Sequence, residues 1–221
     1  MDCRDMKKYL SIFIAALLAF AAVSCEKKAE FERPLGLMSR LTRLSASAGD
    51  TPVIVYSNTD WNASLTSKVT WAGLDRLSGS GCSQVRFRYS ENYGRARKVG
   101  IAFEAGGVRD TLYMIQASGL DNPLLEFASS SAVVPVQGGV QEYVLNSNLV
   151  YDIKDVKAEI RYGEDSPENW LKVVSVELDK MSVNISPNGS GIERTADIVL
   201  LHTDGADDVI STWISIKQFA L

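Results

Sequence analysis

The chain has 221 residues, of which 46% are hydrophobic and 23% are charged, and these values are typical of a globular protein. The formal net charge of −4 argues against general nucleic-acid binding, because contacts to phosphates need a basic surface. The single histidine, His202, excludes catalytic triads and multi-histidine metal sites that do not include it.

Residues 1–24 are typical of a secretory signal peptide. Two lysines at residues 7–8 precede an apolar run over residues 9–23. This run is too short for a comfortable membrane span, so a cleaved signal is favoured over the alternative of an uncleaved anchor. The acidic residues before the lysines are unusual in a signal peptide, and translation from Met6 instead of Met1 would give a cleaner basic start.

Residues 22–25, Ala-Val-Ser-Cys, resemble a bacterial lipobox, in which Cys25 is lipidated and becomes the mature N-terminus. More than one acyl chain on this residue would anchor the protein stably, since a single chain binds membranes only marginally. With Cys25 lipidated, Cys82 has no partner for an internal disulfide, and its small-residue surroundings indicate a loop thiol. We expect residues 25–40 to form the lipidated cysteine and a tether.

Residues 41–118 alternate apolar and polar side chains, as half-buried β-strands do. The alternation is clearest over residues 53–57, 85–89, 99–103 and 112–116. No part of this region shows a convincing helical period. The sequence therefore predicts an all-β domain here, followed by a turn-rich linker at residues 119–123.

The pattern begins again at residue 124, with similar residues in the same order. The matched residues are Gly49 with Gly138-Gly139, Asn58 with Asn148, Trp61 with Tyr151, Trp71 with Trp170, Asn92 with Asn188, Arg97 with Arg194, and Gln116 with Gln218. The sequence offset drifts along the chain, so insertions fall in loops, mainly at residues 154–169. A fixed order with a drifting offset is typical of duplication, and it predicts a second β-sandwich domain over residues 124–221.

Both halves contain Ser-Asn, with an aromatic residue three positions after the asparagine. We expect the asparagine to end a strand in an Asx-type turn. Trp61 or Tyr151 would then begin the next strand and fill the core, and Trp71 and Trp170 would be further core aromatics.

This order of residues resembles the BACON domain (Bacteroidetes-associated carbohydrate-binding, often N-terminal). The first copy carries the resemblance at Ser57, Asn58, Asp60, Trp61, Trp71, Asn92, Arg97, Val99, Ile101 and Gln116. The second copy carries it at Asn148, Tyr151, Trp170, Leu171, Asn188, Arg194, Thr195, Ala196, Ile198, Ile216, Lys217 and Gln218. It departs from the pattern by having Tyr151 in place of tryptophan and by its long charged insertion.

The resemblance covers nearly all of the mature chain and implies two tandem immunoglobulin-like antiparallel β-sandwiches. It also implies a place on the cell envelope of a Bacteroidetes anaerobe, among glycan-degrading enzymes or glycan-capturing lipoproteins. Some members of the family are spacers, so the resemblance leaves both a glycan-binding and a structural role open.

Trp213 is the first candidate glycan contact. Ile214 and Ile216 share one face of a predicted strand, and Trp213 lies on the other face with Ser215 and Lys217. If the isoleucines face the core, the Trp213 ring faces solvent and offers a flat surface on which a pyranose can stack. The alternative is a tryptophan covered by a neighbouring loop or by the other domain.

Arg86 and Arg88 are further candidate glycan contacts, at the start of a basic segment that ends at Lys98. They would share a strand face and meet an acidic polysaccharide or a membrane surface, or else form a solvated face that discourages edge pairing. Residues 202–208, His-Thr-Asp-Gly-Ala-Asp-Asp, are rich in oxygen ligands. Their spacing does not match a calcium loop of the EF-hand type, and Asp-Gly is a hairpin signal, so we expect a hairpin.

No paired-carboxylate motif suggests glycoside hydrolysis, so we predict that the chain is not an enzyme. The predicted function is a lipid-anchored cell-envelope protein whose carbohydrate-binding-type sandwiches bind or present glycan. The alternative is a spacer or protein-interaction subunit without sugar affinity. The expected partners are a polysaccharide, the membrane through Cys25, and envelope proteins, with no nucleic acid, cofactor or metal. The expected location is the outer membrane, on its surface or periplasmic side.

Overall fold

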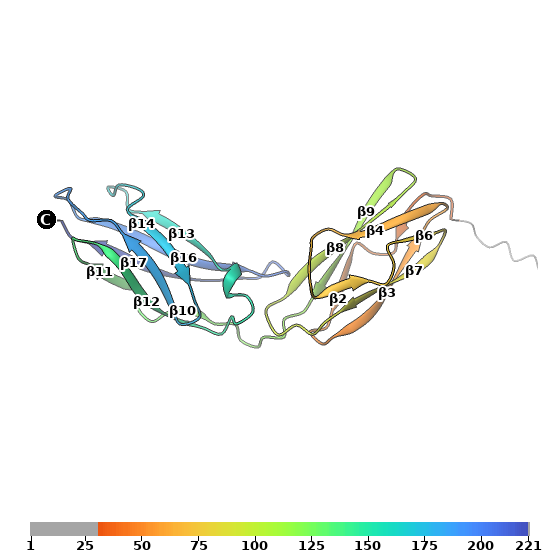
Figure 1. Ribbon diagram of the computed structural model, residues 1–221, viewed down its shortest axis with the longest axis horizontal. Helices are drawn as coiled ribbons and strands as arrows, with labels where there is room; N and C mark the ends of the chain where they lie inside the picture. The colour runs from red at the N-terminus through yellow and green to blue at the C-terminus, as the bar shows by residue number, and fades with distance from the viewer. Residues whose placement is uncertain (1–30, 221) are drawn as a thin grey trace, which may run out of the picture.

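The computed structural model describes residues 31–220, and these residues form two β-sandwiches joined end to end (Figure 1). The prediction of an all-β chain with two tandem immunoglobulin-like sandwiches is confirmed. The predicted signal peptide, the lipidation site Cys25 and the beginning of the tether lie outside the described residues. Within the described part of the chain, no helix has the length and apolar character needed to cross a membrane.

The first sandwich consists of a four-stranded and a five-stranded sheet. The four-stranded sheet has the order β1-β3-β7-β5, formed by Gly36–Leu37, Gly49–Tyr56, Ser83–Tyr89 and Ala72–Leu74. The five-stranded sheet has the order β2-β9-β8-β4-β6, formed by Leu41–Leu44, Val108–Gln116, Arg97–Ala105, Asp60–Leu65 and Ser78–Ser80. All strand pairs are antiparallel except β2 with β9, which is parallel.

The second sandwich repeats this arrangement with two four-stranded sheets. One sheet has the order β10-β12-β15-β14, formed by Leu125–Phe127, Gly139–Ser147, Lys180–Ile185 and Leu171–Val176. The other has the order β11-β17-β16-β13, formed by Ser131–Val134, Val209–Gln218, Arg194–Thr203 and Lys157–Tyr162. Its β11 strand runs parallel to the last strand, as β2 does in the first sandwich. The two halves therefore share one topology, including a first strand divided between the two sheets.

Each sandwich holds an arginine that stacks on a tryptophan and is hydrogen-bonded to a glutamine. The two sets are Trp71, Arg97 and Gln116, and Trp170, Arg194 and Gln218. In both sets the arginine Nε donates to the glutamine Oε1 over 2.8 Å. The guanidinium carbon lies 4.3 Å from the ring centroid in the first set and 4.6 Å in the second. Residues matched from the sequence thus occupy equivalent positions in the two sandwiches.

The Ser-Asn stretches form equivalent turns, but the serine makes the turn. The hydroxyl oxygens of Ser57 and Ser147 accept hydrogen bonds from the backbone N–H two residues later, over 3.1 and 3.2 Å. The Asn58 and Asn148 amides instead reach back to carbonyl groups 26 residues earlier. The predicted Asx-type turn is therefore wrong. The serine hydroxyl accepts the hydrogen bond of the turn, and each asparagine side chain binds the chain segment that precedes its sandwich.

Trp61 fills the core of the first sandwich, as predicted, with 1% of its surface exposed. The same prediction is wrong for Tyr151, which is 60% exposed. The chain after Asn148 does not enter a strand directly, because a turn and the short 3₁₀ helix η1 (Ile153–Asp155) precede β13. Leu149 enters the core in this longer connection, and Tyr151 is left on the outside.

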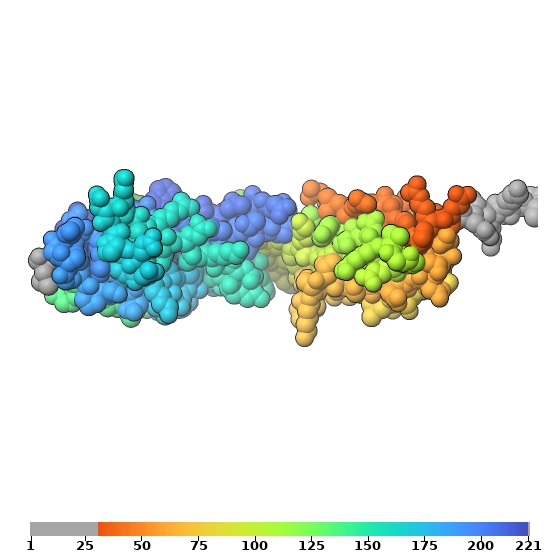
Figure 2. Space-filling model, turned by 90° about the horizontal axis from the view of Figure 1, so that it is seen from above, coloured from red at the N-terminus to blue at the C-terminus, as the bar shows by residue number. Residues whose placement is uncertain are grey.

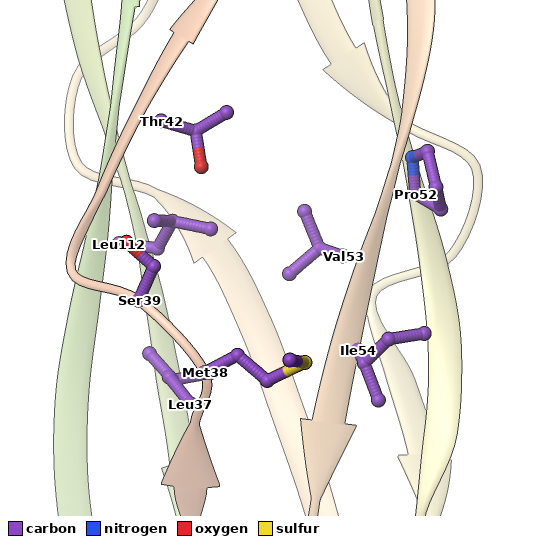
Figure 3. Close-up of a pocket in the computed structure, with 8 residues that line it drawn as sticks. All are labelled: Leu37, Met38, Ser39, Thr42, Pro52, Val53, Ile54 and Leu112. Atoms are coloured by element: carbon purple, nitrogen blue, oxygen red, sulfur yellow. The ribbon is translucent and has the colours of Figure 1, made fainter.

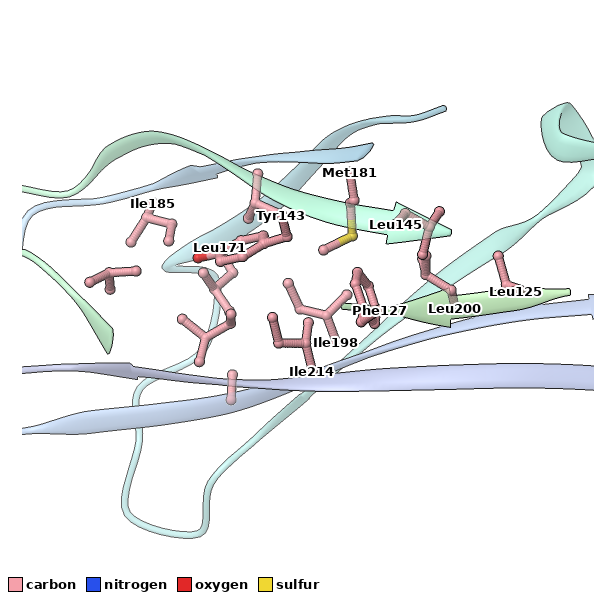
Figure 4. Packing of buried hydrophobic residues seen from close by; sticks show 14 of the residues in the cluster. Leu125, Phe127, Tyr143, Leu145, Leu171, Met181, Ile185, Ile198, Leu200 and Ile214 are labelled. Carbon is pink, nitrogen blue, oxygen red and sulfur yellow. The ribbon is translucent and has the colours of Figure 1, made fainter. Parts of the chain in front are cut away.

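Tyr143 lies in the apolar core of the second sandwich (Figure 4). Its hydroxyl is buried and has no hydrogen-bond partner among the described residues. Burial raises the pKa of Tyr143 to about 12, whereas an unfolded tyrosine titrates near 10. The unfolded chain therefore loses this proton first, and the stability that depends on it is present below about pH 10 and is lost as the pH rises toward 12.

As the pH rises from about 10 to about 12, we expect the raised pKa of Tyr143 to lower the free energy of unfolding by about 2 kcal/mol. A Tyr143→Phe variant should lack that loss and, at neutral pH, should be as stable as the wild type or more stable by about 1 kcal/mol. Urea unfolding followed by circular dichroism measures both. Parallel stability curves for the two proteins across the alkaline range would contradict the prediction.

Candidate functional site

Trp213 lies in β17 between core-facing residues. Ile214 and Ile216 are 2% and 1% exposed, whereas Trp213 is 59% exposed. Strand alternation therefore places the indole ring on the outer surface of the second sandwich, as the sequence predicts. The alternative of a tryptophan covered by a loop or by the other domain is wrong for the described residues.

A hollow of about 340 Å³ opens beside the Trp213 ring, on three neighbouring strands of the β11-β17-β16-β13 sheet. We call the residues that line it the Trp213 face; they are Arg161, Asp197, Val199, Ser211, Thr212 and Trp213. Strand register explains the grouping, because Val199 pairs with Trp213 and Asp197 pairs with Arg161. A flat aromatic ring therefore stands among carboxylate, guanidinium and hydroxyl groups.

Positive charge around the Trp213 face is paired with carboxylates. The Arg161 guanidinium donates to Glu159 over 3.2 Å, and Lys217 lies 2.7 Å from a Glu193 oxygen. Asp197 accepts a hydrogen bond from the Ser215 hydroxyl and, among the described residues, has no cation within 4 Å. The surface around the ring therefore carries no excess of positive charge.

Two other hollows differ from the Trp213 face in their lining. One, of about 110 Å³, is lined mainly by apolar side chains such as Met38 and Ile54, and no charged group lines it (Figure 3). The other, of about 420 Å³, lies at the end of the five-stranded sheet and is polar, with Asp60, Asn62 and Arg109 in its lining but no aromatic residue. Of the three hollows, the Trp213 face combines an exposed aromatic ring with polar groups, which is compatible with carbohydrate binding.

The candidate residues Arg86 and Arg88 lie in β7 of the first sandwich, so the structure does not bring them to Trp213. Both contact the same carboxylate, at 3.1 Å from Arg86 to Asp50 and 3.4 Å from Arg88 to Asp50. The rest of the basic segment does not join them, because Arg97 stacks on Trp71 and Arg95 is only 2% exposed. The predicted segment is therefore not one basic patch.

The sequence did not reveal the interdomain interface, formed by residues 93–98 of the first sandwich and residues 151–155 and 202–208 of the second. Residues 204–208 form the end of the β16–β17 hairpin, as the Asp-Gly signal predicts, and this hairpin reaches the first sandwich (Figure 1). The backbone N–H of Gly205 donates to the carbonyl of Ala96 over 2.7 Å. The space-filling view shows the two sandwiches in direct contact at this point (Figure 2).

Tyr151 also belongs to this interface. Its ring stacks on that of Tyr93 with 5.9 Å between centroids. The longer connection before β13, which leaves Tyr151 outside the core, thus supplies a contact to the first sandwich. Repeat comparison missed this contact, because it matched Tyr151 with the core residue Trp61.

No family model matches this sequence, and no curated protein matches it. Among similar solved structures is a family 5 xyloglucanase from Bacteroides ovatus in complex with a XXXG heptasaccharide. It has 14% identity and a TM-score of 0.36, covering 48% of this chain and 27% of that chain. An endo-fucoidan hydrolase of glycoside hydrolase family 107 has 12% identity and a TM-score of 0.32, covering 87% of this chain and 30% of that chain. A SusE-like surface-located polysaccharide-binding protein from the Bacteroides thetaiotaomicron heparin utilisation locus has 10% identity and a TM-score of 0.29, covering 85% and 33%.

The prediction that this chain is not an enzyme is corrected by these comparisons. It depended on the lack of a recognisable carboxylate motif. Two of the similar structures are glycoside hydrolases, so the exclusion does not stand. The chain spans only 27% and 30% of those two hydrolase chains, and their named activities are not transferred to it.

Proposed function

We propose that this chain is a BACON-like envelope lipoprotein that binds a neutral polysaccharide at the Trp213 face. Lipidation at Cys25 would hold it at the outer membrane, with the residues up to the first sandwich as its tether. The observation that carries the proposal is the Trp213 ring, which is 59% exposed and lies beside a polar hollow on a β-sheet.

An exposed tryptophan on a strand suits the chemistry of sugar rings. The C–H groups on one face of a pyranose form an apolar surface that can cover an indole ring, and the hydroxyl groups at its rim need hydrogen-bond partners. The Asp197 carboxylate can accept such bonds, the Arg161 guanidinium can donate them, and the Ser211 hydroxyl can do both. Burial of apolar ring area with a few polar groups for orientation is the usual design of a ligand site.

The charge distribution supports a neutral ligand. Arg161 and Lys217 each lie beside a glutamate, so a sulfate or uronate group near either cation would also meet a negative charge. The Asp197 carboxylate would repel an anionic sugar placed on the ring. We therefore expect a polyanionic glycan to bind this surface less well than a neutral one.

The alternative is a spacer without sugar affinity, and the interdomain interface favours it. Arg95 is buried between the two sandwiches and bonded to residues of the second. Such an interface holds the sandwiches end to end and lets the chain act as a rod between the membrane and another envelope component. A rod also suits presentation of the Trp213 face, so the two functions differ only in whether the face binds sugar.

Affinity electrophoresis of the chain from Glu26 onward, which contains every strand of both sandwiches, tests the proposal. We expect at least one neutral polysaccharide to retard the protein, free oligosaccharide of the same type to reverse this, and sulfated or uronic-acid polysaccharides to have no effect. Lack of retardation by every neutral polysaccharide, with circular dichroism showing folded protein, would favour the spacer. Binding to anionic polysaccharides alone would contradict the ligand class.

A further inference from the structure

Arg95 is the central residue of the interdomain interface. From the first sandwich, its Nη1 donates to Nδ1 of His202 and to the His202 carbonyl, each over 2.9 Å. Its Nη2 donates to an Asp208 carboxylate oxygen over 2.7 Å, and an Asp204 oxygen lies 3.6 Å away. The Arg95 backbone N–H donates to Asp152 over 2.8 Å. One buried arginine thus contacts both segments of the second sandwich that form the interface.

The contact with His202 requires a neutral imidazole. An arginine side chain carries only donors and stays charged, so the Nδ1 atom of His202 must be the acceptor in this bond. Protonation would place an N–H group where the lone pair now lies, facing an arginine N–H at 2.9 Å. It would also put two cations in contact inside a site where His202 is 5% exposed. The bond cannot form in that state.

Charged groups from each neighbouring segment face His202. They are Arg95 from the first sandwich, Asp152 and Asp155 from the turn before β13, and Asp204 from the same hairpin. Burial and then Arg95 lower the pKa of His202 from its ordinary value, and the three aspartates only partly oppose them. The closed interface therefore binds a proton less readily than an exposed imidazole, whose ordinary pKa is about 6.5, and loss of the Arg95 contact removes one of the causes.

We propose that the interdomain interface is acid-sensitive, and that protonation of His202 releases Arg95 and frees the two sandwiches to move relative to each other. As the pH falls below about 6.5, the open form gains a proton that the closed form excludes, so the equilibrium shifts toward the open form. The free energy that favours the closed form keeps falling until the pH reaches the lowered pKa of His202 in that form. Above about 6.5 the histidine is neutral in both forms and the interface is fully stable.

Other contacts of the interface do not involve His202. The Tyr93–Tyr151 stack and the Gly205–Ala96 hydrogen bond are two of them. The carboxylates of the interface are also present in a variant that lacks His202, so any opening that their protonation causes would appear in that variant as well. Comparison of the wild type with such a variant therefore identifies the opening that requires the imidazole.

Distances between two nitroxide labels test this proposal in the chain from Glu26 onward. Cys82 is its only cysteine and is exposed in the first sandwich, and Val140→Cys adds a second exposed site, on β12 of the second sandwich. We expect one narrow distance distribution at about pH 7.5 and a broad one at about pH 5, where His202 gains its proton. Because His202 is the single histidine, its Hε1 proton gives one NMR signal, which should titrate with the same midpoint as the broadening.

A His202→Asn variant is the matched control, because the asparagine oxygen can accept the Arg95 hydrogen bond and does not titrate. Its distribution should stay narrow at about pH 5, whereas that of the wild type should broaden. A wild-type distribution that stays narrow while His202 titrates would overturn the proposal. Broadening with a midpoint that differs from that of the His202 signal would also overturn it. This comparison of midpoints uses the wild type alone, so it still tests the proposal if the variant interface is open at every pH.

Discussion

A Trp213→Ala variant is expected to bind its polysaccharide about 30-fold more weakly than the wild type. Truncation of a tryptophan at the centre of a binding surface commonly costs about 2 kcal/mol, which corresponds to that ratio. The loss arises because the alanine removes the flat apolar surface on which the sugar ring lies, while the surrounding polar groups remain. Isothermal titration calorimetry with the polysaccharide or oligosaccharide found in the binding screen measures it.

Two controls separate the role of the ring from general damage. Trp213 is exposed, so the variant should unfold at the same urea concentration as the wild type. A Trp213→Phe variant keeps an aromatic face and should retain most of the affinity. An Arg86→Ala change, on the first sandwich, should leave binding unchanged. Equal losses for the Trp213 and Arg86 variants, or no loss for Trp213→Ala, would remove the Trp213 face as the site.

The orientation of Trp213 could be predicted because strand alternation is local. Ile214 and Ile216 identify the core face without reference to any other part of the chain. The shared positions of Arg97 and Arg194 could be found for a related reason, since duplicated sandwiches keep the same packing around an arginine and its tryptophan. The hollow beside Trp213 could not be found in this way, because it also needs residues from β13 and β16.

The interdomain interface could not be predicted, because its partners are distant in the sequence. Arg95 contacts residues 107 and 113 positions later, and it stands in a basic segment that resembles a solvated strand face. Periodicity describes the core of one domain and carries no information on how two domains meet. The exposed position of Tyr151 has the same origin, since its stacking partner Tyr93 belongs to the other sandwich.

Replacement of Arg95 by methionine is expected to lower the free energy of unfolding by about 2–3 kcal/mol at neutral pH. The variant leaves the Nδ1 atom of His202 and the buried Asp204 carboxylate without their arginine contacts. The loss is smaller than for a fully enclosed ion pair, because the Asp208 side chain is 70% exposed and can turn to water. Urea unfolding followed by tryptophan fluorescence measures the change.

The effect of the Arg95→Met change should fall on whichever sandwich unfolds first. The interface exists only while both sandwiches are folded, so its free energy stabilises the less stable one and is already lost when the second unfolds. The matched control is Arg86→Met, which removes an exposed ion pair and should cost no more than about 1 kcal/mol. If both variants unfold as the wild type does, the sandwiches are not coupled through Arg95. A loss confined to the first transition of Arg95→Met would show that the rod is held together by this residue.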